Sequence, residues 1–397
     1  MSVKAKAELA ASVGRIGAHV VKDRLQRSRP TTLAEVPLAP EALTPQWLTA
    51  ALCRDIVGAE VVGVAVAGGS DGTTTRRTLR ITYNEAGVRA GLPATVFAKS
   101  TPRFTSRLVC GLSGAVVSES EFYSTIRPKL DLDSPVGYHA AVDTRSFRSM
   151  ILLEDVASTR GARFGGPTSL PVTRPMAESV VGQMAIYHGA FWGSSRLGSE
   201  FPWLKTSEQF QVDINATIAF ESRTMIGIDR ARAVIPGALL DRRAELWPAL
   251  MRSLVLNGRP PITLLHSDVH AGNWYVTGDG RMGLYDWQCM TKGQWALDFA
   301  YALLSALTVE DRRAWERELL ELYLDRLEPA DGPAPTFDEA WLAYRQQTFH
   351  ALVFWLYTIG AGRLQPDMQP KDVCLANVER MANAVVDLES LDSLSPG

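Results

Sequence analysis

The spacing of apolar residues changes near Glu154, and this change constrains the fold more than any other feature of the sequence. Before it, short apolar or alternating segments bounded by turn residues predict strands, at 61–66, 78–83, 95–99, 138–142 and 149–153. After it, longer segments repeat apolar residues at helical spacing, at 176–192, 239–255, 308–327 and 337–359. A β-rich part followed by a larger helical part predicts an α+β chain with a small N-terminal lobe, a larger helical C-terminal lobe and a cleft between them.

Proline residues and helix-start signals divide the sequence into three predicted segments. Residues 1–43 predict an Ala-rich helix with a basic face and a Pro-punctuated linker, residues 44–153 the first lobe, and residues 154–397 the second. The first lobe opens on a helix, because Thr44 can cap it and Pro45 suits its first position. We expect the N-terminal helix to pack on the protein body or on a second subunit rather than on a membrane surface, since its apolar face lacks large residues.

Charge and cysteine content argue against several classes of function. The 41 Lys and Arg residues against 43 Asp and Glu give a net charge of -2. Proteins that bind nucleic acid concentrate positive charge, so we expect no such partner. The four cysteines are far apart and form no CxxC pair, so neither a disulfide framework nor a zinc site is indicated. No stretch reaches the ~18 uninterrupted apolar residues of a membrane span and the N-terminus has no apolar signal region, so we expect a cytoplasmic protein.

One strand–loop–strand segment carries the residue types of a phosphoryl-transfer site. An apolar strand delivers His266-x-Asp268 into a loop, Asn273 follows five residues after the aspartate, and a second strand delivers Asp286. Phosphoryl transfer needs a carboxylate for the proton of the attacking hydroxyl, and oxygen ligands that hold Mg²⁺ on the phosphates. Asp268 suits the first task, and Asn273 with Asp286 suit the second. The alternative is a chance match on a turn, where Asp, Asn and Gly are common.

Lys99 is the corresponding signal in the first lobe. It ends a strand that looks buried, where a lysine is costly unless its charge is paired. A phosphate oxygen and a carboxylate, Glu119 or Glu121, would pair it; otherwise the side chain reaches water at the strand end. The Gly-rich turn that precedes it contains Ser70 and Gly72, and could cradle phosphates with its backbone N–H groups or form a plain hairpin turn.

Taken in order, these motifs resemble the aminoglycoside phosphotransferase-like superfamily of small-molecule kinases. The resemblance spans roughly residues 45–385 and rests on this ordered set: Lys99, Glu119-x-x-Phe-Tyr, Ile151-Leu-Leu-Glu-Asp155, His188-Gly-Ala-Phe-Trp192, His266-Ser-Asp-x4-Asn273, Tyr285-Asp-Trp-Gln288 and Leu297-Asp-Phe-Ala-Tyr301. The second, fourth and sixth of these motifs are most similar to the ecdysteroid-kinase-like and choline-kinase-like branch. Ser267 stands where the family pattern has Gly, which should leave Asp268 undisturbed but could narrow the conformations of the loop.

The resemblance implies a two-lobed protein-kinase-like fold, with ATP and Mg²⁺ as cofactors, and it implies roles for further residues. Backbone groups near Glu154 and Val156 would hold the adenine. Asp298 would brace the catalytic loop by accepting its backbone N–H groups, although it also suits a helix N-cap. His266 would support the two acidic loops rather than transfer protons.

The acceptor of the phosphoryl group is less constrained. The helical lobe is rich in aromatic residues, of which Trp192, Trp203 and Trp287 are candidates for an acceptor pocket; aromatic residues at helical spacing otherwise belong to the core. We therefore expect an ATP-dependent phosphotransferase whose substrate is a small, neutral and partly apolar alcohol. The alternatives are an aminoglycoside or amino-alcohol kinase, and a nucleotide-binding pseudokinase scaffold, which would not need the base Asp268.

Overall fold

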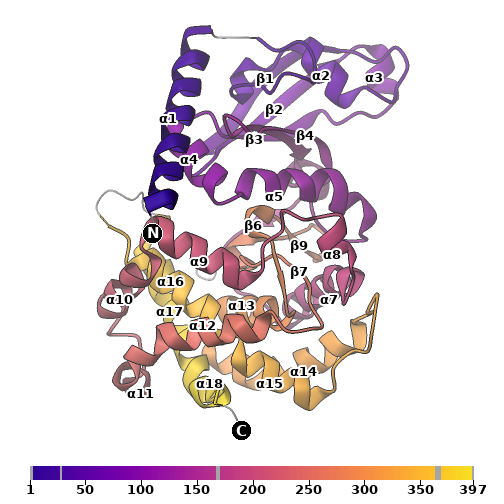
Figure 1. The fold of residues 1–397 in the computed structure, drawn as a ribbon. Coiled ribbons are helices and arrows are strands. Elements are labelled where there is room, and N and C mark those ends of the chain that lie inside the picture. Colours follow the sequence, from indigo (N-terminus) through magenta and orange to yellow (C-terminus); the bar gives the residue numbers. More distant parts are fainter. Residues whose placement is uncertain (1–2, 27–28, 167–169, 363–367, 396–397) are drawn as a thin grey trace. The chain divides into compact units, whose positions relative to one another are not determined.

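The chain forms two compact units in a computed structural model that describes residues 3–26, 29–166, 170–362 and 368–395. The first unit comprises Met1–Lys129 and Ser134–Ala162. The second comprises Leu130–Asp133 and Arg163–Gly397. Figure 1 labels the elements of both units, which are described one at a time below.

An antiparallel sheet is the framework of the first unit. Its strands are β1 (Val61–Asp71), β2 (Thr75–Tyr83), β3 (Thr95–Ser100), β4 (Gly137–Asp143) and β5 (Arg148–Glu154). In the described residues they are ordered β1-β2-β3-β5-β4, with every neighbouring pair antiparallel. The helices of this unit are α1 (Val3–Gln26), α2 (Pro45–Leu52), α3 (Glu85–Arg89), α4 (Phe104–Leu112), α5 (Ala115–Glu121) and α6 (Val156–Arg160).

The predicted start of α2 is confirmed. Thr44 lies at its N-cap with extended backbone and accepts a hydrogen bond from the Trp47 N–H (3.1 Å), while Pro45 occupies the first helical position. The indole of Trp47 is fully buried in a core that also contains Leu79 and Leu152. The N-cap therefore stabilises the start of α2, and the burial of Trp47 attaches the helix to the sheet.

The predicted Gly-rich turn at 67–74 is partly wrong. Strand β1 continues to Asp71, where it pairs with Thr75, so only the tip of this hairpin is a turn. The strand passes through its glycines with an irregular register, and a Cβ on Gly69 would stand 2.1 Å from the Arg76 carbonyl oxygen. Glycine is needed here because two paired strands approach each other closely. In the sequence, glycines that serve this purpose cannot be distinguished from glycines of a flexible turn.

The N-terminal helix α1 packs within the first unit, where Ile16 and Val20 are buried. Its Asp23 carboxylate lies 2.6 Å from the guanidinium of Arg107 on α4 and 3.0 Å from that of Arg148 on β5. The guanidinium of Arg107 is wholly excluded from solvent. The helix that the sequence predicts as an extension is therefore attached to the sheet unit by a buried charge cluster.

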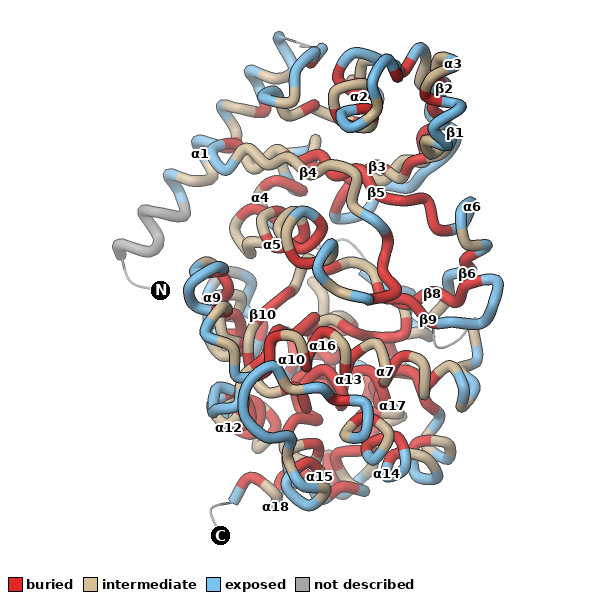
Figure 2. Tube along the Cα trace, turned by 90° about the vertical axis from the view of Figure 1, so that its right-hand side faces the viewer, coloured by how far each residue is buried: buried red, intermediate tan, exposed pale blue. Residues whose placement is uncertain are grey.

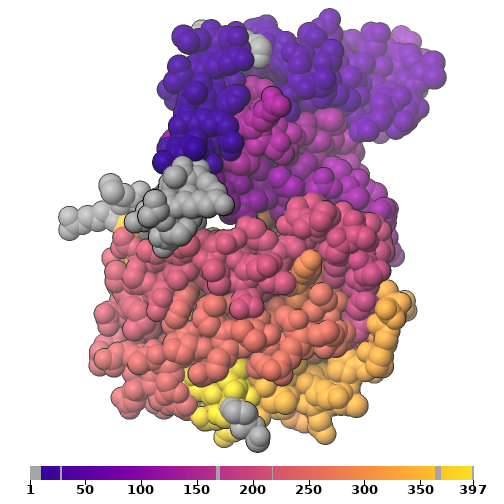
Figure 3. Space-filling model, in the orientation of Figure 1, coloured from indigo at the N-terminus to yellow at the C-terminus, as the bar shows by residue number. Residues whose placement is uncertain are grey.

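Helices dominate the second unit. They are α7 (Arg174–Phe191), α8 (Arg196–Ser199), α9 (Ser207–Ile218), α10 (Phe220–Arg230), α11 (Gly237–Asp241), α12 (Leu246–Asn257), α13 (Ala296–Ala306), α14 (Val309–Arg326), α15 (Phe337–Gln346), α16 (Thr348–Ile359), α17 (Lys371–Asp387) and α18 (Ser390–Ser393). Short strands accompany them: β6 (Arg163–Phe164), β7 (Thr263–Leu265), β8 (Trp274–Val276), β9 (Met282–Leu284) and β10 (Thr291–Gly293). Helices α13 and α16 are largely buried (Figure 2), whereas the segment from α10 to α12 reaches the surface on the face shown in Figure 3.

The segment Leu130–Asp133 belongs to this helical unit although the residues on both sides of it belong to the first. The backbone N–H of Asp133 donates to the Gln183 side chain (2.6 Å), and its carbonyl accepts from the Leu284 N–H (2.8 Å). Its carboxylate accepts from the Tyr275 hydroxyl (2.7 Å). These contacts join the segment to α7 and to the β8–β9 hairpin.

The predicted α+β class is confirmed, since a β-rich unit is followed by a larger helical one. The predicted lobe boundary after residue 153 falls at the end of β5. Within the described residues, none of the helices combines the length and the apolarity that crossing a bilayer takes.

Candidate active site

A hydrogen-bonded loop follows strand β7 in the second unit. The fully buried strand delivers Asp268, and Asn273 ends a short 3₁₀ turn downstream. The side-chain amide of Asn273 donates to the Asp268 carbonyl (2.8 Å) and to its carboxylate Oδ2 (3.2 Å). The five-residue spacing seen in the sequence therefore closes a loop in which one residue orients the other.

Asp298, in the first turn of α13, holds the backbone of this loop. Its carboxylate accepts the N–H groups of His266 (2.7 Å) and Ser267 (2.8 Å), and the hydroxyl of Tyr187 (2.7 Å). Burial by itself would raise the pKa of Asp298, but hydrogen bonds from His188 and Tyr187 hold it below its usual value. A charged, fully buried carboxylate thus satisfies two backbone donors of the loop that carries Asp268.

Ser267 adopts the left-handed backbone conformation, with φ 64°. Such a conformation favours Gly, so a serine here needs compensating contacts. Its hydroxyl shares a hydrogen bond with the Thr291 hydroxyl (2.6 Å), and its carbonyl accepts from His350 Nε2 (2.9 Å). These contacts hold Ser267 in the left-handed conformation from which the chain continues to Asp268.

His266 connects the two acidic loops. Its Nε2 faces the Tyr285 carbonyl (3.0 Å) and must therefore donate, while its Nδ1 accepts the Asp268 N–H (3.3 Å). Both ring nitrogens are occupied by backbone groups, so the imidazole fixes the spacing of the loops that carry Asp268 and Asp286.

The carboxylate of Asp268 has a distinctive environment. Its Oδ1 accepts from the Tyr301 hydroxyl (3.3 Å) and lies 3.8 Å from His270 Nε2. Burial, with a further contribution from the charge of Asp286, raises the pKa of Asp268 to about 7. Burial also lowers the pKa of His270 to about 4, so its imidazole is neutral at neutral pH. The carboxylate of Asp268 therefore changes its protonation near neutral pH.

The residues predicted to bind Mg²⁺ fit that ion by their chemistry. Asn273 turns its amide NH₂ toward Asp268, which directs its amide oxygen elsewhere. Asp286 follows β9, has a left-handed backbone (φ 66°) and accepts a hydrogen bond from the Gln288 amide. The described residues contain no cluster of three or more His, Cys, Asp or Glu side chains suited to a metal. Mg²⁺ commonly binds through one or two protein oxygens and completes its shell with substrate phosphates and water, so two ligands suffice.

In the first unit, Lys99 forms the predicted ion pair. Its ammonium lies 2.8 Å from the Glu119 carboxylate, and both side chains are almost wholly buried. Glu121, the other candidate, accepts from the Thr125 hydroxyl (3.2 Å). The alternative in which Lys99 reaches water at the strand end is therefore wrong.

The other predicted nucleotide-binding residues lie at two places in this unit. Ser70 is a paired strand residue opposite Arg76, and the Gly72 N–H donates to the Thr74 carbonyl (3.0 Å) at the hairpin tip. Because that N–H already donates to a carbonyl, it is less available to bind a phosphate than the sequence suggested.

Glu154 ends β5, and Val156 begins α6. The Glu154 carboxylate binds Arg160 and Thr159 and accepts the Val136 N–H, so this side chain is structural. The adenine contacts that the resemblance implies would use backbone groups near these residues, and they stay a prediction.

The three candidate acceptor-pocket tryptophans have different surroundings. Trp192 and Trp287 are fully buried, and the Trp287 ring packs edge-on against Tyr187 (5.1 Å) and beneath His266 (4.4 Å). Trp203 is half-buried beside Phe201. The core alternative describes Trp192 and Trp287 better, and a pocket role for any of the three stays a prediction.

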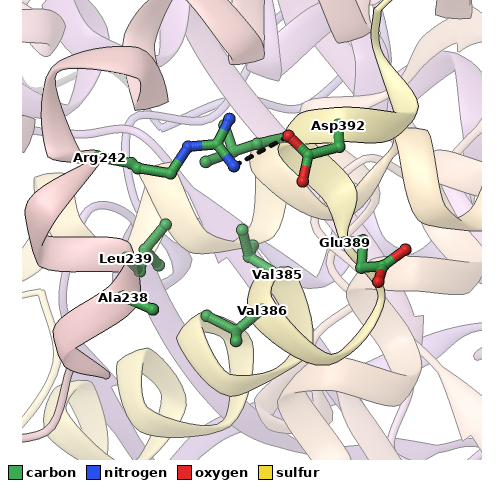
Figure 4. A pocket seen from close by; sticks show the side chains of 8 residues that line it. Ala238, Leu239, Arg242, Val385, Val386, Glu389 and Asp392 are labelled. Carbon is green, nitrogen blue, oxygen red and sulfur yellow. Dashed lines mark hydrogen bonds and ion pairs between the residues drawn. The ribbon is translucent and has the colours of Figure 1, made fainter.

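A cavity of about 150 Å³ lies elsewhere in the second unit, between α11, α17 and α18 (Figure 4). It is lined by Leu239 and Val385 on its apolar side and by Arg242, which pairs with Asp392 (2.9 Å). None of the predicted site residues lines it.

Sequence reasoning assigned no role to Tyr301 or His270, which both approach Asp268. For Tyr301 a signal existed: it follows Asp298 by three positions, so both residues lie on one face of α13. His270 lies in the same loop as Asp268, and only the folded loop brings it to the carboxylate.

Comparisons with known proteins concern the segment that contains this loop. Residues 209–341 match the model of APH, the phosphotransferase enzyme family. The match includes Asp268, Asn273, Asp286 and Asp298, and over this segment it confirms the predicted resemblance to the aminoglycoside phosphotransferase-like superfamily. The narrower likeness to its ecdysteroid-kinase-like branch stays a prediction. No curated protein matches the chain.

Several solved structures are similar to the chain at low identity. The GDP and kanamycin complex of APH(2")-IIia has 10% identity, covers 86% of this chain and 97% of its own, and has a TM-score of 0.49. Choline kinase LicA from Streptococcus pneumoniae has 13% identity, coverages of 82% and 94%, and a TM-score of 0.45. The macrolide 2'-phosphotransferase MphH from Brachybacterium faecium has 16% identity, coverages of 79% and 89%, and a TM-score of 0.45.

Proposed function

We propose that this chain, whose residues 209–341 match the model of the phosphotransferase enzyme family, transfers the γ-phosphoryl group of ATP to a hydroxyl of a small molecule. The observation that carries the proposal is the Asp268–Asn273 loop braced by Asp298. The loop presents a carboxylate of raised pKa that accepts a hydrogen bond from the Asn273 amide NH₂ and feels the charge of a second carboxylate, Asp286. Those groups are the set that phosphoryl transfer requires.

Asp268 acts as the base in this proposal. Its carboxylate accepts the proton of the acceptor hydroxyl as the acceptor oxygen forms its bond to the γ-phosphorus. The bond from that phosphorus to the bridging oxygen breaks, and ADP leaves with the electron pair. A carboxylate whose pKa lies at about 7 holds a proton more readily than an ordinary aspartate, which favours this transfer at neutral pH.

Asn273 and Asp286 would hold Mg²⁺ through their side-chain oxygens. When bound, the ion neutralises charge on the phosphate oxygens. The chain's own part is to present these oxygens in fixed positions, which the Asn273–Asp268 hydrogen bonds do on one side and the Gln288 amide on the other.

Lys99, paired with Glu119, would bind phosphate oxygens of the nucleotide, and the pair supports this role because a buried ammonium keeps its charge only beside an acceptor. Backbone groups around Ser70, Gly72, Glu154 and Val156 would contact the rest of the nucleotide. Of these the Gly72 N–H has the weakest support.

The proposed acceptor is a neutral, partly apolar alcohol. The rings near Asp268 support it: Tyr301 and His270 approach the carboxylate, His270 is neutral, and Trp355 packs edge-on against His270 (5.4 Å). Uncharged aromatic neighbours of the proposed base favour an apolar alcohol over a polycation. The alternative acceptor is an aminoglycoside or amino alcohol, which would call for further carboxylates around the same base.

Replacing Asp268 tests the proposal. We expect Asp268→Asn to lower turnover ~10²–10⁴-fold, because a positioned base is lost while the shape is kept. ATP affinity should change little. Turnover is measured by ADP release with any alcohol accepted from a panel that spans sterol-like alcohols and kanamycin-like polycations, and affinity by calorimetry.

The matched control is Asp279→Asn, an exposed aspartate of the same unit, which should behave like wild type. Near-normal turnover of Asp268→Asn would overturn the mechanism. A wild-type protein that binds ATP but phosphorylates nothing in the panel would favour the scaffold instead.

A further inference from the structure

Helix α13 contacts the catalytic loop through two side chains one turn apart. Asp298 accepts the backbone N–H groups of His266 and Ser267, and Tyr301 directs its hydroxyl to the side chain of Asp268 (3.3 Å). One helix therefore fixes both the backbone of the loop and the group that reacts.

The two oxygens of the Asp268 carboxylate have different donors. Oδ2 accepts from the Asn273 amide (3.2 Å), and Oδ1 accepts from the Tyr301 hydroxyl (3.3 Å). With a donor on each oxygen, rotation of the carboxylate about its terminal bond is restricted. If the hydroxyl of Tyr301 were absent, Oδ1 would lose its hydrogen bond and would face His270 Nε2 at 3.8 Å, beyond hydrogen-bond distance, while Oδ2 would keep the Asn273 amide.

Tyr301 is itself held rigidly. Its ring is almost wholly buried, packs edge-on against His350 (5.6 Å) and lies tilted against His270 (6.0 Å). Burial, and then the negative charge of Asp268, raise the pKa of Tyr301 well above its usual value, so the hydroxyl keeps its proton and acts as a donor. A rigid donor that keeps its proton can orient a carboxylate without competing for the proton being transferred.

We propose that Tyr301 is a positioning residue for phosphoryl transfer, and that its hydroxyl fixes the rotation of the Asp268 carboxylate in which the acceptor hydroxyl reaches it. The inference rests on the proposed function, since it gives Tyr301 a role through the base. Tyr301 touches neither phosphate nor acceptor in this role; it determines the fraction of time in which the base is correctly oriented.

Removal of the hydroxyl alone tests the inference. Tyr301→Phe should lower kcat about 10- to 100-fold, the loss expected when a hydrogen bond to a charged group disappears. The KM for ATP should stay within about twofold, because no nucleotide contact changes. Both values come from a steady-state ADP-release assay on the full-length protein.

The chain offers a matched control for a merely structural effect. Tyr344 is also fully buried in the second unit and donates to a carboxylate, that of Glu316 (2.9 Å). Tyr344→Phe removes the same kind of bond away from the catalytic loop. We expect the two variants to lose similar thermal stability but only Tyr301→Phe to lose kcat. Equal kcat values in both variants would overturn the inference.

The double variant Asp268→Asn with Tyr301→Phe separates this inference from the proposed function. If Tyr301 acts through Asp268, the double variant should be no slower than Asp268→Asn alone. A further loss of more than about tenfold in the double variant would contradict a role through the base. Normal turnover of Asp268→Asn would contradict the proposed function itself. An inactive Asp268→Asn variant together with a fully active Tyr301→Phe variant would contradict only the role of Tyr301.

Discussion

Lys99 and Glu119 show how single residues decide whether a charge can be buried in this protein. Their charged groups are 2.8 Å apart, with only 6% and 5% of the respective side chains exposed. Desolvation of two charges roughly offsets their attraction, so the pair contributes little net stability while both members are present. Removal of one member is a different matter, because the other charge then stays buried and loses this ion pair.

We predict that Lys99→Ala lowers the free energy of unfolding by about 3–5 kcal/mol, because the buried Glu119 carboxylate loses the ammonium that lies 2.8 Å from it. Replacing both members with apolar residues of similar size, Lys99→Met with Glu119→Leu, should recover most of that loss. Urea denaturation measures both effects. Neither variant should bind ATP with wild-type affinity, because both lack the ammonium.

The exposed pair of Arg89 and Glu85 serves as the control, since Arg89→Ala should change stability by less than about 0.5 kcal/mol. If Lys99→Ala proved as stable as wild type, the burial of this ion pair would have no energetic consequence, which would contradict the prediction.

Single residues were predictable from the sequence where their chemistry is local. Asp268 and Asn273 interact over five positions of one loop, and the cost of burying Lys99 pointed to a carboxylate on the next helix. Tyr301 was not singled out because its contact with Asp268 crosses from a helix to a loop. For Trp192, large aromatic residues in a helix look alike whether they line a pocket or fill a core.

At the scale of elements, α1 supplies the acid that pairs with Arg107 of α4. The Arg107 guanidinium is wholly buried, and Asp23 approaches it at 2.6 Å. Burial lowers the pKa of Arg107, which reflects the cost of keeping its charge there. The Nε of Arg107 donates to the Thr101 carbonyl (3.1 Å), just beyond the end of β3. The N-terminal helix therefore helps to hold the strand that carries Lys99.

We predict that Asp23→Ala destabilises the protein by about 3–5 kcal/mol, because Arg107 would keep a buried charge with no carboxylate beside it. The double variant Asp23→Ala with Arg107→Met should be more stable than the single variant. The measurement is the midpoint of urea unfolding followed by tryptophan fluorescence.

The control lies on the same helix: Leu25 is 80% exposed, so Leu25→Ala should leave the midpoint nearly unchanged. An Asp23→Ala protein with a wild-type midpoint would mean that α1 is attached by its apolar face alone.

Elements were predictable where apolar residues recur periodically and capping residues mark the start of a helix, as Thr44 and Pro45 do for α2. They were not predictable where tertiary contacts end them. The predicted helix 337–359 is two helices, α15 and α16, because the Gln346 carbonyl accepts from the Ser253 hydroxyl (2.6 Å) and Gln347 donates to the Ser253 carbonyl (2.9 Å). Ser253 lies on α12, and no local sequence pattern near 346–347 predicts its contact with these residues. The same holds for β8, a strand paired with β9 inside the predicted loop.

For the whole molecule, the proposed residues belong to two units: Lys99 and Glu119 to the first, Asp268, Asn273 and Asp286 to the second. A ligand that binds only the folded protein raises its stability with the logarithm of the ligand concentration divided by Kd. We predict that MgATP at 100 times its Kd stabilises the full-length protein by about 2.7 kcal/mol. Thermal unfolding with and without the nucleotide measures the effect.

Metal removal is the second arm of this prediction. With excess EDTA, turnover should vanish, because Asn273 and Asp286 would have no ion to hold on the phosphates. A zinc-selective chelator should have no effect, since oxygen ligands of this kind do not favour zinc. Full activity in EDTA would contradict the assignment of both residues.

The course of the chain through Leu130–Asp133 limits how such a protein can be recombined. Everything after Ala162 belongs to the helical unit, yet that unit also contains a short stretch encoded ahead of β4 and β5. A crossover that exchanged the gene after codon 162 with that of a relative would separate Tyr275 and the Leu284 N–H from Asp133, with which they interact. Inheritance of the helical unit as a block therefore requires a compatible residue at position 133, so these positions should vary together among functional hybrids.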